Sequence, residues 1–346
     1  MRINQDRRRF LSTAAATIAG LEVGMLGATK SLVRGIGIAG DSELRALRGA
    51  TAWLNTTPLS ADGLRGKVVL VDFCTYTCIN WLRTLPYVRA WAEKYGEHGL
   101  VVIGAHTPEF VFERDVENVR RAIAAMRVQY PIAVDNDYAV WNGFSNQYWP
   151  ALYLLDAKGA IRFTHFGEGA YDQSERSIQQ LLVDAGAGGF SREVVTPGAR
   201  GIEAPADWDN LKSGETYLGA AQAEHFVRNA TRLRLNEWTL AGDWTVGSKA
   251  VALQKPDGKI DYRFHARDVH LVMGPAGRGA SARFVVRLDG QAPGAAHGTD
   301  VDEHGRGVVA EQRTYHLIRQ QRPIVDRQFE IEFLDPGVEA FCFTFG

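Results

Sequence analysis

The chain has 346 residues, of which 45% are hydrophobic and 23% charged, and its formal net charge is −1. This length suits two domains better than one, and the composition is that of an ordinary globular protein. The near-neutral charge provides no basic surface for nucleic acid, so we expect no nucleic-acid partner. The cysteines, Cys74, Cys78 and Cys342, are too few for a disulfide-rich scaffold or a four-thiolate metal site, and we expect no metal and no cofactor.

The N-terminus carries Arg7-Arg8-Arg9-Phe10-Leu11 before a mildly apolar run that ends near Ala28. Twin arginines before Phe-Leu resemble the twin-arginine signal that exports folded proteins. Glu22 and several Gly and Thr residues make the run too polar for a stable membrane helix, so we expect no stable membrane insertion after signal removal. We predict a signal and tether over residues 1–40 and a periplasmic or otherwise extracytoplasmic location. The alternative is a disordered basic tail on a cytosolic protein.

A buried strand, a short polar turn and a helix follow one another between Val68 and Pro86. The apolar run up to Val71 is typical of a fully buried strand, and the apolar residues after the turn have helical spacing. Cys78 therefore falls in the first turn of the helix, where the helix dipole and open amide groups favour an anion. We expect a lowered thiol pKa and an available thiolate at this position.

Strands and helices continue to alternate after this point. A second buried strand, Leu100–Ala105, ends in His106-Thr107-Pro108-Glu109. Functional groups collect at the carboxyl ends of strands in such sheets, so we expect His106 and Glu109 to lie near Cys78. The rest of the pattern comprises a helix at about 115–126, a strand at 131–135, a strand and hairpin turn before a strand at 161–166, and a helix at about 173–185.

Short alternating strands replace long helices beyond a stretch rich in Gly, Pro and Ala at 186–210. Many short strands with turns between them predict a β-sandwich. Trp238, Trp244 and Tyr262 could stack on a sugar, but aromatic residues on strands more often belong to the core. We expect strands at 262–265, 283–288, 313–317, 328–333 and 338–345.

The region around Cys78 resembles the thioredoxin family. Val71-Asp72-Phe73 precedes the turn, Cys78 begins the helix, and Pro86 follows eight positions later. The resemblance implies that Asp72 is a buried acid that transfers protons. It also implies that Trp149–Pro150 is a cis-proline segment that packs against the active cysteine and presents the substrate backbone. Thioredoxins have Cys-x-x-Cys, whereas here Trp81 stands at the resolving position and Cys74 stands where a tryptophan is usual.

Several runs match one branch more closely: Cys78-Ile79-Asn80, Arg83-Thr84-Leu85-Pro86-Tyr87-Val88, His106-Thr107-Pro108-Glu109-Phe110, Tyr148-Trp149-Pro150-Ala151, His165-Phe166-Gly167-Glu168-Gly169, Glu215-Thr216-Tyr217-Leu218-Gly219 and Phe343-Thr344-Phe345-Gly346. They resemble the extracytoplasmic part of DipZ-type thiol:disulfide interchange proteins, within the periplasmic thioredoxin-like and peroxiredoxin-like branch. The resemblance implies an α/β thioredoxin fold over 41–187, with a central mixed sheet, helices on both faces and a cis-proline. A linker over 188–211 and an all-β, jelly-roll-like sandwich over 212–346, similar to carbohydrate-binding modules, would follow.

The sequence predicts a thiol–disulfide oxidoreductase that uses Cys78 as its single nucleophile. The thiolate would attack a disulfide, a glutathione adduct or a peroxide, and an external thiol reductant would clear the resulting mixed disulfide or sulfenic acid. Cys74 is a candidate second thiol. A strand-to-helix turn would usually hold these two Cα atoms beyond the ~7 Å that a disulfide tolerates, so we expect Cys74 to be a buried filler. Cys342, in an alternating strand, is expected in the core.

The remaining candidate site residues are less specific. Thr77, Trp81, His106 and Glu109 are candidate substrate-binding residues, and Trp81 either shields the thiolate, docks a peptide or only packs. Asp72 is either a catalytic base or a structural residue whose client thiol is gone.

Two other functions stay open. One is a redox-inactive thioredoxin-fold protein that binds peptides or envelope glycans, with a glycan or protein partner for the C-terminal domain. The weaker one is a peroxiredoxin-like peroxidase acting on a peroxide substrate, which Thr75-Tyr76-Thr77-Cys78 suggests but Val71, at that family's proline position, does not support.

Overall fold

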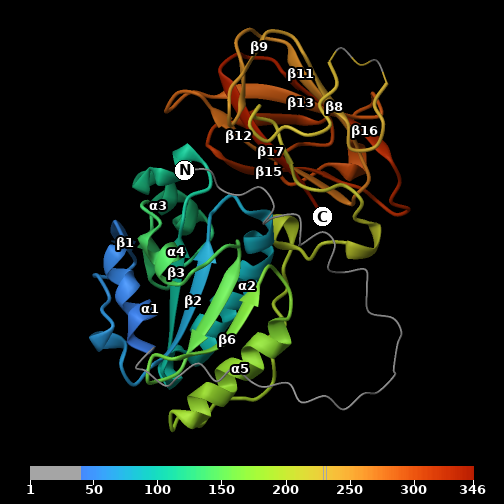
Figure 1. Ribbon diagram of the computed structural model, residues 1–346. Coiled ribbons are helices and arrows are strands. Elements are labelled where there is room, and N and C mark those ends of the chain that lie inside the picture. Colours follow the sequence, from blue (N-terminus) through green and yellow to red (C-terminus); the bar gives the residue numbers. More distant parts are fainter. Residues whose placement is uncertain (1–39, 229, 231) are drawn as a thin grey trace, which may run out of the picture. The chain divides into compact units, whose positions relative to one another are not determined.

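The computed structural model describes residues 40–228, 230 and 232–346 (Figure 1). The described chain forms two compact units that are not sequential. Residues 40–74, 87–108 and 128–195 belong to the first unit, and residues 75–86, 109–127 and 196–346 belong to the second. The predicted signal and tether lie outside the described residues except at Gly40, and the boundaries predicted at 41, 188 and 212 stay a prediction. Within the described part of the chain, no helix has both the length and the apolarity that crossing a bilayer requires.

The first unit contains a six-stranded mixed sheet with the order β1-β4-β3-β2-β5-β6 (Figure 1). β2 pairs in parallel with β3 and β3 with β4, whereas β1, β5 and β6 pair antiparallel with their neighbours. The strands are β1 (Ala52–Leu54), β2 (Val68–Cys74), β3 (Leu100–His106), β4 (Ile132–Val134), β5 (Ala151–Leu155) and β6 (Ile161–Phe166).

Helices cover both faces of this sheet. Val69, Val71 and Phe73 of β2 point to one face, where they share an apolar cluster with residues of α1 (Gly40–Ala46) and α4 (Ala139–Gly143). Side chains alternate along a strand, so the residues between them face the other side. There α5 (Tyr171–Asp184) contacts β2 and β6. The indole of Trp91 donates to Glu175 of α5 (3.1 Å) and joins the last turns of α2 (Ile79–Tyr95) to that helix.

The elements predicted for this region are confirmed within a few residues. The strand at Val68–Val71 extends to Cys74, and the hairpin turn after β5 leads into β6 as expected. The peptide bond between Trp149 and Pro150 is cis, as the thioredoxin resemblance implies. β1, α1 and α4 were not expected, since each is short and lacks a clear period.

The second unit contains a β-sandwich of two antiparallel sheets. One has the order β15-β12-β17-β10-β9, with β7 also paired to β17, and the other has the order β14-β13-β16-β11-β8 (Figure 1). The strands are β7 (Thr216–Tyr217), β8 (Trp238–Ala241), β9 (Trp244–Val246), β10 (Val251–Leu253), β11 (Gly258–Phe264), β12 (Asp268–Pro275), β13 (Ala282–Leu288), β14 (Arg306–Val309), β15 (Arg313–Arg319), β16 (Arg327–Phe333) and β17 (Val338–Phe345).

An aromatic-rich core fills the sandwich, as the alternation predicts. Trp238 and Tyr262 are buried within it, and the indole of the partly buried Trp244 donates to the carbonyl of Ala241 (2.9 Å). These three aromatic residues therefore pack and cap rather than form an open sugar-stacking platform. The second unit also includes α3 (Val116–Ala125), which begins after Asp115, whose carboxylate accepts from the amide of Glu117 (2.9 Å).

Candidate active site

Cys78 lies at the N-terminal boundary of α2, as the sequence predicts. Its amide donates to the carbonyl of Thr75 (3.1 Å), which closes the turn after β2. Its carbonyl accepts from the amide of Leu82 (2.9 Å), the first bond of the helix. Cys78 as a residue is partly exposed. The amide groups of the first helical turn are thus oriented toward the sulfur, which is the geometry of a thiolate site.

The pKa of the Cys78 thiol is nevertheless raised, and the prediction of a lowered pKa is wrong. Burial is the largest cause. The backbone N–H groups of Trp81 and Asn80 act in the expected direction and lower the pKa, but the carboxylates of Glu109 and Glu215 oppose them. The helix N-terminus therefore favours the thiolate, but burial and the two carboxylates outweigh this effect, and the net result is a raised pKa.

The other two thiols are packed away from solvent. Cys74 is the fully buried last residue of β2, where it pairs in register with His106 of β3. Cys342 is buried in β17, and its thiol donates to the carbonyl of Phe343 (3.3 Å). All three cysteines lie within the described residues, and none of them forms a disulfide. The structure therefore confirms the packing expected for Cys74 and Cys342 and holds no bridge from Cys74 to Cys78.

Asp72 and His106 belong to the first unit with Cys74. Asp72 is fully buried in β2, opposite Gly104 of β3. Its charge and that of Cys74 add to burial in raising the pKa of Tyr130 well above its ordinary value. Burial lowers the pKa of His106 to about 4, so this imidazole is neutral at pH 7. The catalytic roles expected of Asp72 and His106 stay predictions.

The substrate-binding candidates fall in different places. Trp81 is fully buried, which favours packing over peptide docking. Trp149 is partly buried and lies against the indole of Trp141, with 4.3 Å between ring centroids. Glu109 is partly buried and accepts a hydrogen bond from the hydroxyl of Tyr217 (2.5 Å). Its charge raises the pKa of the Cys78 thiol, which agrees with the position near Cys78 that we expect from the sequence.

A buried carboxyl group that the sequence did not single out, Glu113, holds the turn before Cys78. The hydroxyl of Thr77 donates to Glu113 Oε1 (2.6 Å), and the amides of Glu109 and Phe110 donate to Oε2 (2.6 and 2.8 Å). Glu113 is fully buried. Burial and the nearby charge of Glu109 raise its pKa to about 7, while hydrogen bonds from Thr77 and from the amide of Phe110 act against the shift. The sequence signal that could have identified Glu113 is the capping-box pattern, in which a glutamate follows the N-cap residue by three positions. The signal is weak here because the N-cap residue is neither Ser nor Thr.

Residues 75–86 make two further polar contacts inside the second unit. The carbonyl of Thr77 accepts from the hydroxyl of Thr314 in β15 (2.6 Å). Arg83, buried in the first half of α2, donates through Nη2 to the carbonyl of Phe345 in β17 (2.9 Å). Together with Glu113, these bonds fix the backbone on both sides of Cys78.

A second polar cluster, in the sandwich, has the composition of a metal site. Side-chain ligand atoms of Asp268, His270 and His316 all lie within 4.8 Å of one another. Two guanidinium groups already bind the carboxylate, Arg319 through Nε (2.7 Å) and Arg267 through Nη2 (2.7 Å). Burial acts to raise the pKa of Asp268, but His316, Arg319 and Arg267 outweigh it and hold the pKa well below its usual range. Two cations beside the carboxylate disfavour a third, so this cluster is a buried ion-pair network.

A mixed sheet with helices on both faces and a cis-proline hairpin, with Cys78 following its central strand β2, is the arrangement of the thioredoxin fold. The second unit adds an all-β domain, and residues 213–346 match the family model described as "Thioredoxin like C-terminal domain".

The chain is similar to Protein DipZ of Mycobacterium tuberculosis. The two are 35% identical over 316 residues, which cover 87% of this chain and 42% of that protein. The chain thus spans less than half the length of this relative. It is also 28% identical to thiol-disulfide oxidoreductase YkuV of Bacillus subtilis over 138 residues, 40% of this chain and 93% of YkuV. Among solved structures, a thiol-disulfide isomerase from Corynebacterium glutamicum is 26% identical, with 38% of this chain and 92% of that chain covered and a TM-score of 0.36.

Proposed function

We propose that this chain is a thiol–disulfide oxidoreductase that uses Cys78 as a single nucleophile. The observation that carries the proposal is the position of Cys78, a partly exposed residue at the first turn of α2, where the amides of Asn80 and Trp81 favour the thiolate. The homology to YkuV, named as a thiol-disulfide oxidoreductase, and to DipZ supports it.

The proposed reaction is exchange through a mixed disulfide. The thiolate of Cys78 attacks one sulfur of a substrate disulfide, the S–S bond breaks, and the other sulfur leaves as a thiolate that takes up a proton. An external thiol then attacks the mixed disulfide, restores Cys78 and carries away the first sulfur as a new disulfide. Trp81 stands where a resolving cysteine would be, so the external thiol is an obligatory partner.

Glu113 is a positioning residue in this scheme. It binds Thr77 and the amides of Glu109 and Phe110, so it holds the turn that ends at Cys78. Trp149–Pro150 is proposed to present the substrate backbone, and Asp72 to transfer a proton, as the thioredoxin resemblance implies.

A turnover assay tests the proposal. The full chain is given a glutathionylated peptide with excess reduced glutathione, and release of the peptide thiol is followed by mass spectrometry. We expect catalysis that Cys78→Ser abolishes and that Cys342→Ala, which alters a buried thiol of β17, leaves unchanged. Equal rates for wild type and Cys78→Ser would refute the proposal.

The raised pKa of Cys78 favours one second candidate, a redox-inactive thioredoxin-fold protein that binds peptides or glycans. In that case the assay shows no catalysis, and Cys78 resists alkylation in the folded chain. A peroxide substrate remains the weaker proposal, tested by replacing the peptide with hydrogen peroxide in the same assay.

We also propose an extracytoplasmic location, supported by the Arg7–Leu11 pattern, and a glycan or protein partner for the C-terminal domain. Replacing Arg8 and Arg9 with lysine and measuring the periplasmic fraction tests the location: retention in the cytoplasm supports it, and unchanged export argues against a twin-arginine route.

A further inference from the structure

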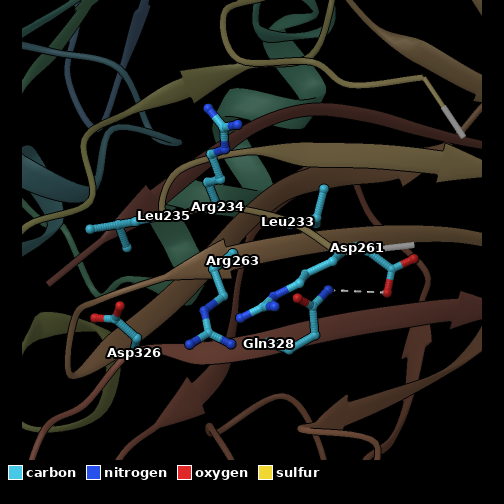
Figure 2. A pocket seen from close by; sticks show the side chains of 8 residues that line it. Leu233, Arg234, Leu235, Asp261, Arg263, Asp326 and Gln328 are labelled. Carbon is cyan, nitrogen blue, oxygen red and sulfur yellow. Dashed lines mark hydrogen bonds between the residues drawn. The ribbon is translucent and has the colours of Figure 1, made fainter. Parts of the chain in front are cut away.

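A polar pocket opens on the outer face of the sandwich, at one end of β11 and β16. Its volume is about 700 Å³, and it is lined by Arg232, Leu233, Arg234, Leu235, Asp261, Arg263, Asp326 and Gln328 (Figure 2). We call these eight residues the arginine pocket. This size lies within the range of small-molecule sites. Three arginines against two aspartates give the lining a formal charge of +1.

At this end of the sheet, the strand register places no acidic residue of β16 opposite Arg263. Along the outer face of β11 and β16, Lys259 pairs with Glu330 and Glu332 at 3.4 and 3.5 Å, and Arg287 of β13 reaches the same two carboxylates. Further along this face, Asp261 stands opposite Glu330, and Arg263 stands opposite Gln328, a neutral residue. The pattern of opposite charges therefore stops where the pocket begins.

The loop before β8 adds two more guanidinium groups. The amide of Asn236 donates to the carbonyl of Arg263 (2.7 Å), and the amide of Arg263 donates to the carbonyl of Glu237 (3.0 Å), so the loop is fixed against β11. Arg232 and Arg234 of this loop line the pocket together with Arg263. Figure 2 shows Arg263 directed toward Asp326 and Gln328, while Arg234 extends away from them at the rim.

The carboxylates of the pocket are already engaged, whereas its guanidinium groups are not. Asp326 lies 2.6 Å from the imidazole of His265, and Asp261 accepts from the amide of Gln328 (3.4 Å), the bond drawn in Figure 2. Over residues 40–228, 230 and 232–346, the side chains of Arg232, Arg234 and Arg263 have no ion pair or hydrogen bond. Guanidinium groups that line a pocket without ion-pair partners of their own favour an oxyanion, which can accept two parallel N–H bonds from one guanidinium group.

We propose that the arginine pocket binds a hydroxyl-rich small molecule bearing a carboxylate or phosphate group, as an acidic saccharide does. Arg263 and Arg232 hold the acid group, Asp261 and Gln328 exchange hydrogen bonds with hydroxyl groups, and Leu233 and Leu235 contact the apolar face of the ring. This inference rests on the proposed binding role of the C-terminal domain and deepens it. It is independent of Cys78.

Titration of the full chain, followed by isothermal calorimetry at low salt, tests the inference. The probes are a uronic-acid disaccharide, its neutral counterpart, a sugar phosphate and inorganic phosphate. We expect one of the two acidic sugars to bind at least about tenfold more tightly than the neutral sugar and than inorganic phosphate, because charge-assisted bonds add to the hydroxyl contacts. The tighter of the two acidic sugars identifies the source of the acid group.

Variants separate the pocket from the rest of the surface. Arg263→Gln and Arg232→Gln should each weaken binding by about tenfold, since each removes a charge-assisted contact. Arg283→Gln is the matched control, because Arg283 projects from the neighbouring strand β13 and is already bound by Asp335 (2.8 Å). Equal affinity of wild type, Arg263→Gln and Arg232→Gln would overturn the assignment.

The outcomes also separate this inference from the broader proposal. If the neutral disaccharide binds as tightly as the acidic one, the anionic specificity is wrong while a glycan partner stands. If inorganic phosphate binds as tightly as either acidic sugar, the hydroxyl contacts are wrong. If no sugar binds, both the inference and the glycan partner fail, whereas the Cys78 assay is unaffected.

Discussion

At Cys78 two opposing effects act on the same sulfur. The amides of the first turn of α2 stabilise the thiolate, while burial and the carboxylates of Glu109 and Glu215 stabilise the thiol. A thiol with a raised pKa forms little thiolate at neutral pH, but the thiolate that does form is a stronger nucleophile. The structure therefore describes a thiol whose reactivity depends on its acidic neighbours.

Replacing Glu109 should make Cys78 more reactive. Glu109→Gln removes a charge that raises the pKa of the thiol, and its amide oxygen can still accept from Tyr217. We expect iodoacetamide labelling of Cys78 at pH 7.5 to accelerate about threefold or more. Glu215→Gln is the matched control: Glu215 is exposed, so solvent screens its charge and the acceleration should be smaller. Slower labelling of Glu109→Gln would contradict the assigned electrostatics.

The buried carboxyl of Glu113 should make stability fall as pH rises. Its folded pKa of about 7 lies above the ordinary 4.5, so below pH 4.5 the group is neutral in both states and has no cost. Between pH 4.5 and pH 7, Glu113 is ionised in the unfolded chain but still protonated in the folded chain. The free energy of unfolding therefore falls by roughly 3 kcal/mol over this range and levels off above pH 7. Glu113→Gln resembles the neutral form and should lose this dependence.

Guanidinium-induced unfolding at pH 5 and pH 8 measures the difference between wild type and Glu113→Gln. Glu117→Gln, on the exposed face of α3, is the control and should follow the wild type at both pH values. If the free energy of unfolding changes between pH 5 and pH 8 by the same amount in the wild type and in Glu113→Gln, Glu113 ionises normally in the folded chain.

At the scale of elements, β3 is held close to its neighbours by one glycine. A Cβ on Gly104 would lie 2.5 Å from Ile132 Cδ1 of β4, 3.3 Å from the ring of Tyr130 and 3.7 Å from Cys74 Sγ. Overpacking of this kind forces side chains out of their preferred rotamers.

We therefore expect Gly104→Ala to destabilise the chain by about 1–3 kcal/mol. Gly96→Ala is the control, because a Cβ there meets nothing within 4 Å. Thermal unfolding of the two variants provides the comparison. Equal midpoints would show that β4 and Tyr130 can move aside.

Local patterns predicted the elements that depend on local sequence. The apolar run of β2 and the start of α2 next to Cys78 follow from short motifs, and both are found. The cis bond before Pro150, which the thioredoxin resemblance implies, is also found. β12 was not expected, although it lies in the middle of its sheet. Every residue of Asp268–Pro275 is buried, so the strand shows no alternation, and it includes His, Gly and Pro.

At the scale of the whole molecule, the features missed by sequence analysis depend on residues distant in the chain. Glu113 is 36 residues from Thr77, to which it binds. The pKa of Cys78 depends on Glu109 and Glu215, and no local pattern predicts how deeply a thiol is buried. The neutral partner of Arg263, Gln328, is set by the register of β11 against β16. Sequence analysis therefore located the candidate nucleophile but not the groups that set its pKa.

The central claim is that one thiol of three is the nucleophile. Iodoacetamide labelling of the folded chain as a function of pH, with each cysteine quantified by peptide mass spectrometry, tests it most directly. We expect Cys78 to label alone, because Cys74 and Cys342 are buried. Its rate should rise with an apparent pKa above the ~8.5 of an ordinary thiol. If Cys78 stays as inert as the other two until denaturant is added, it is not the nucleophile, and the chain is a thioredoxin-shaped binding protein.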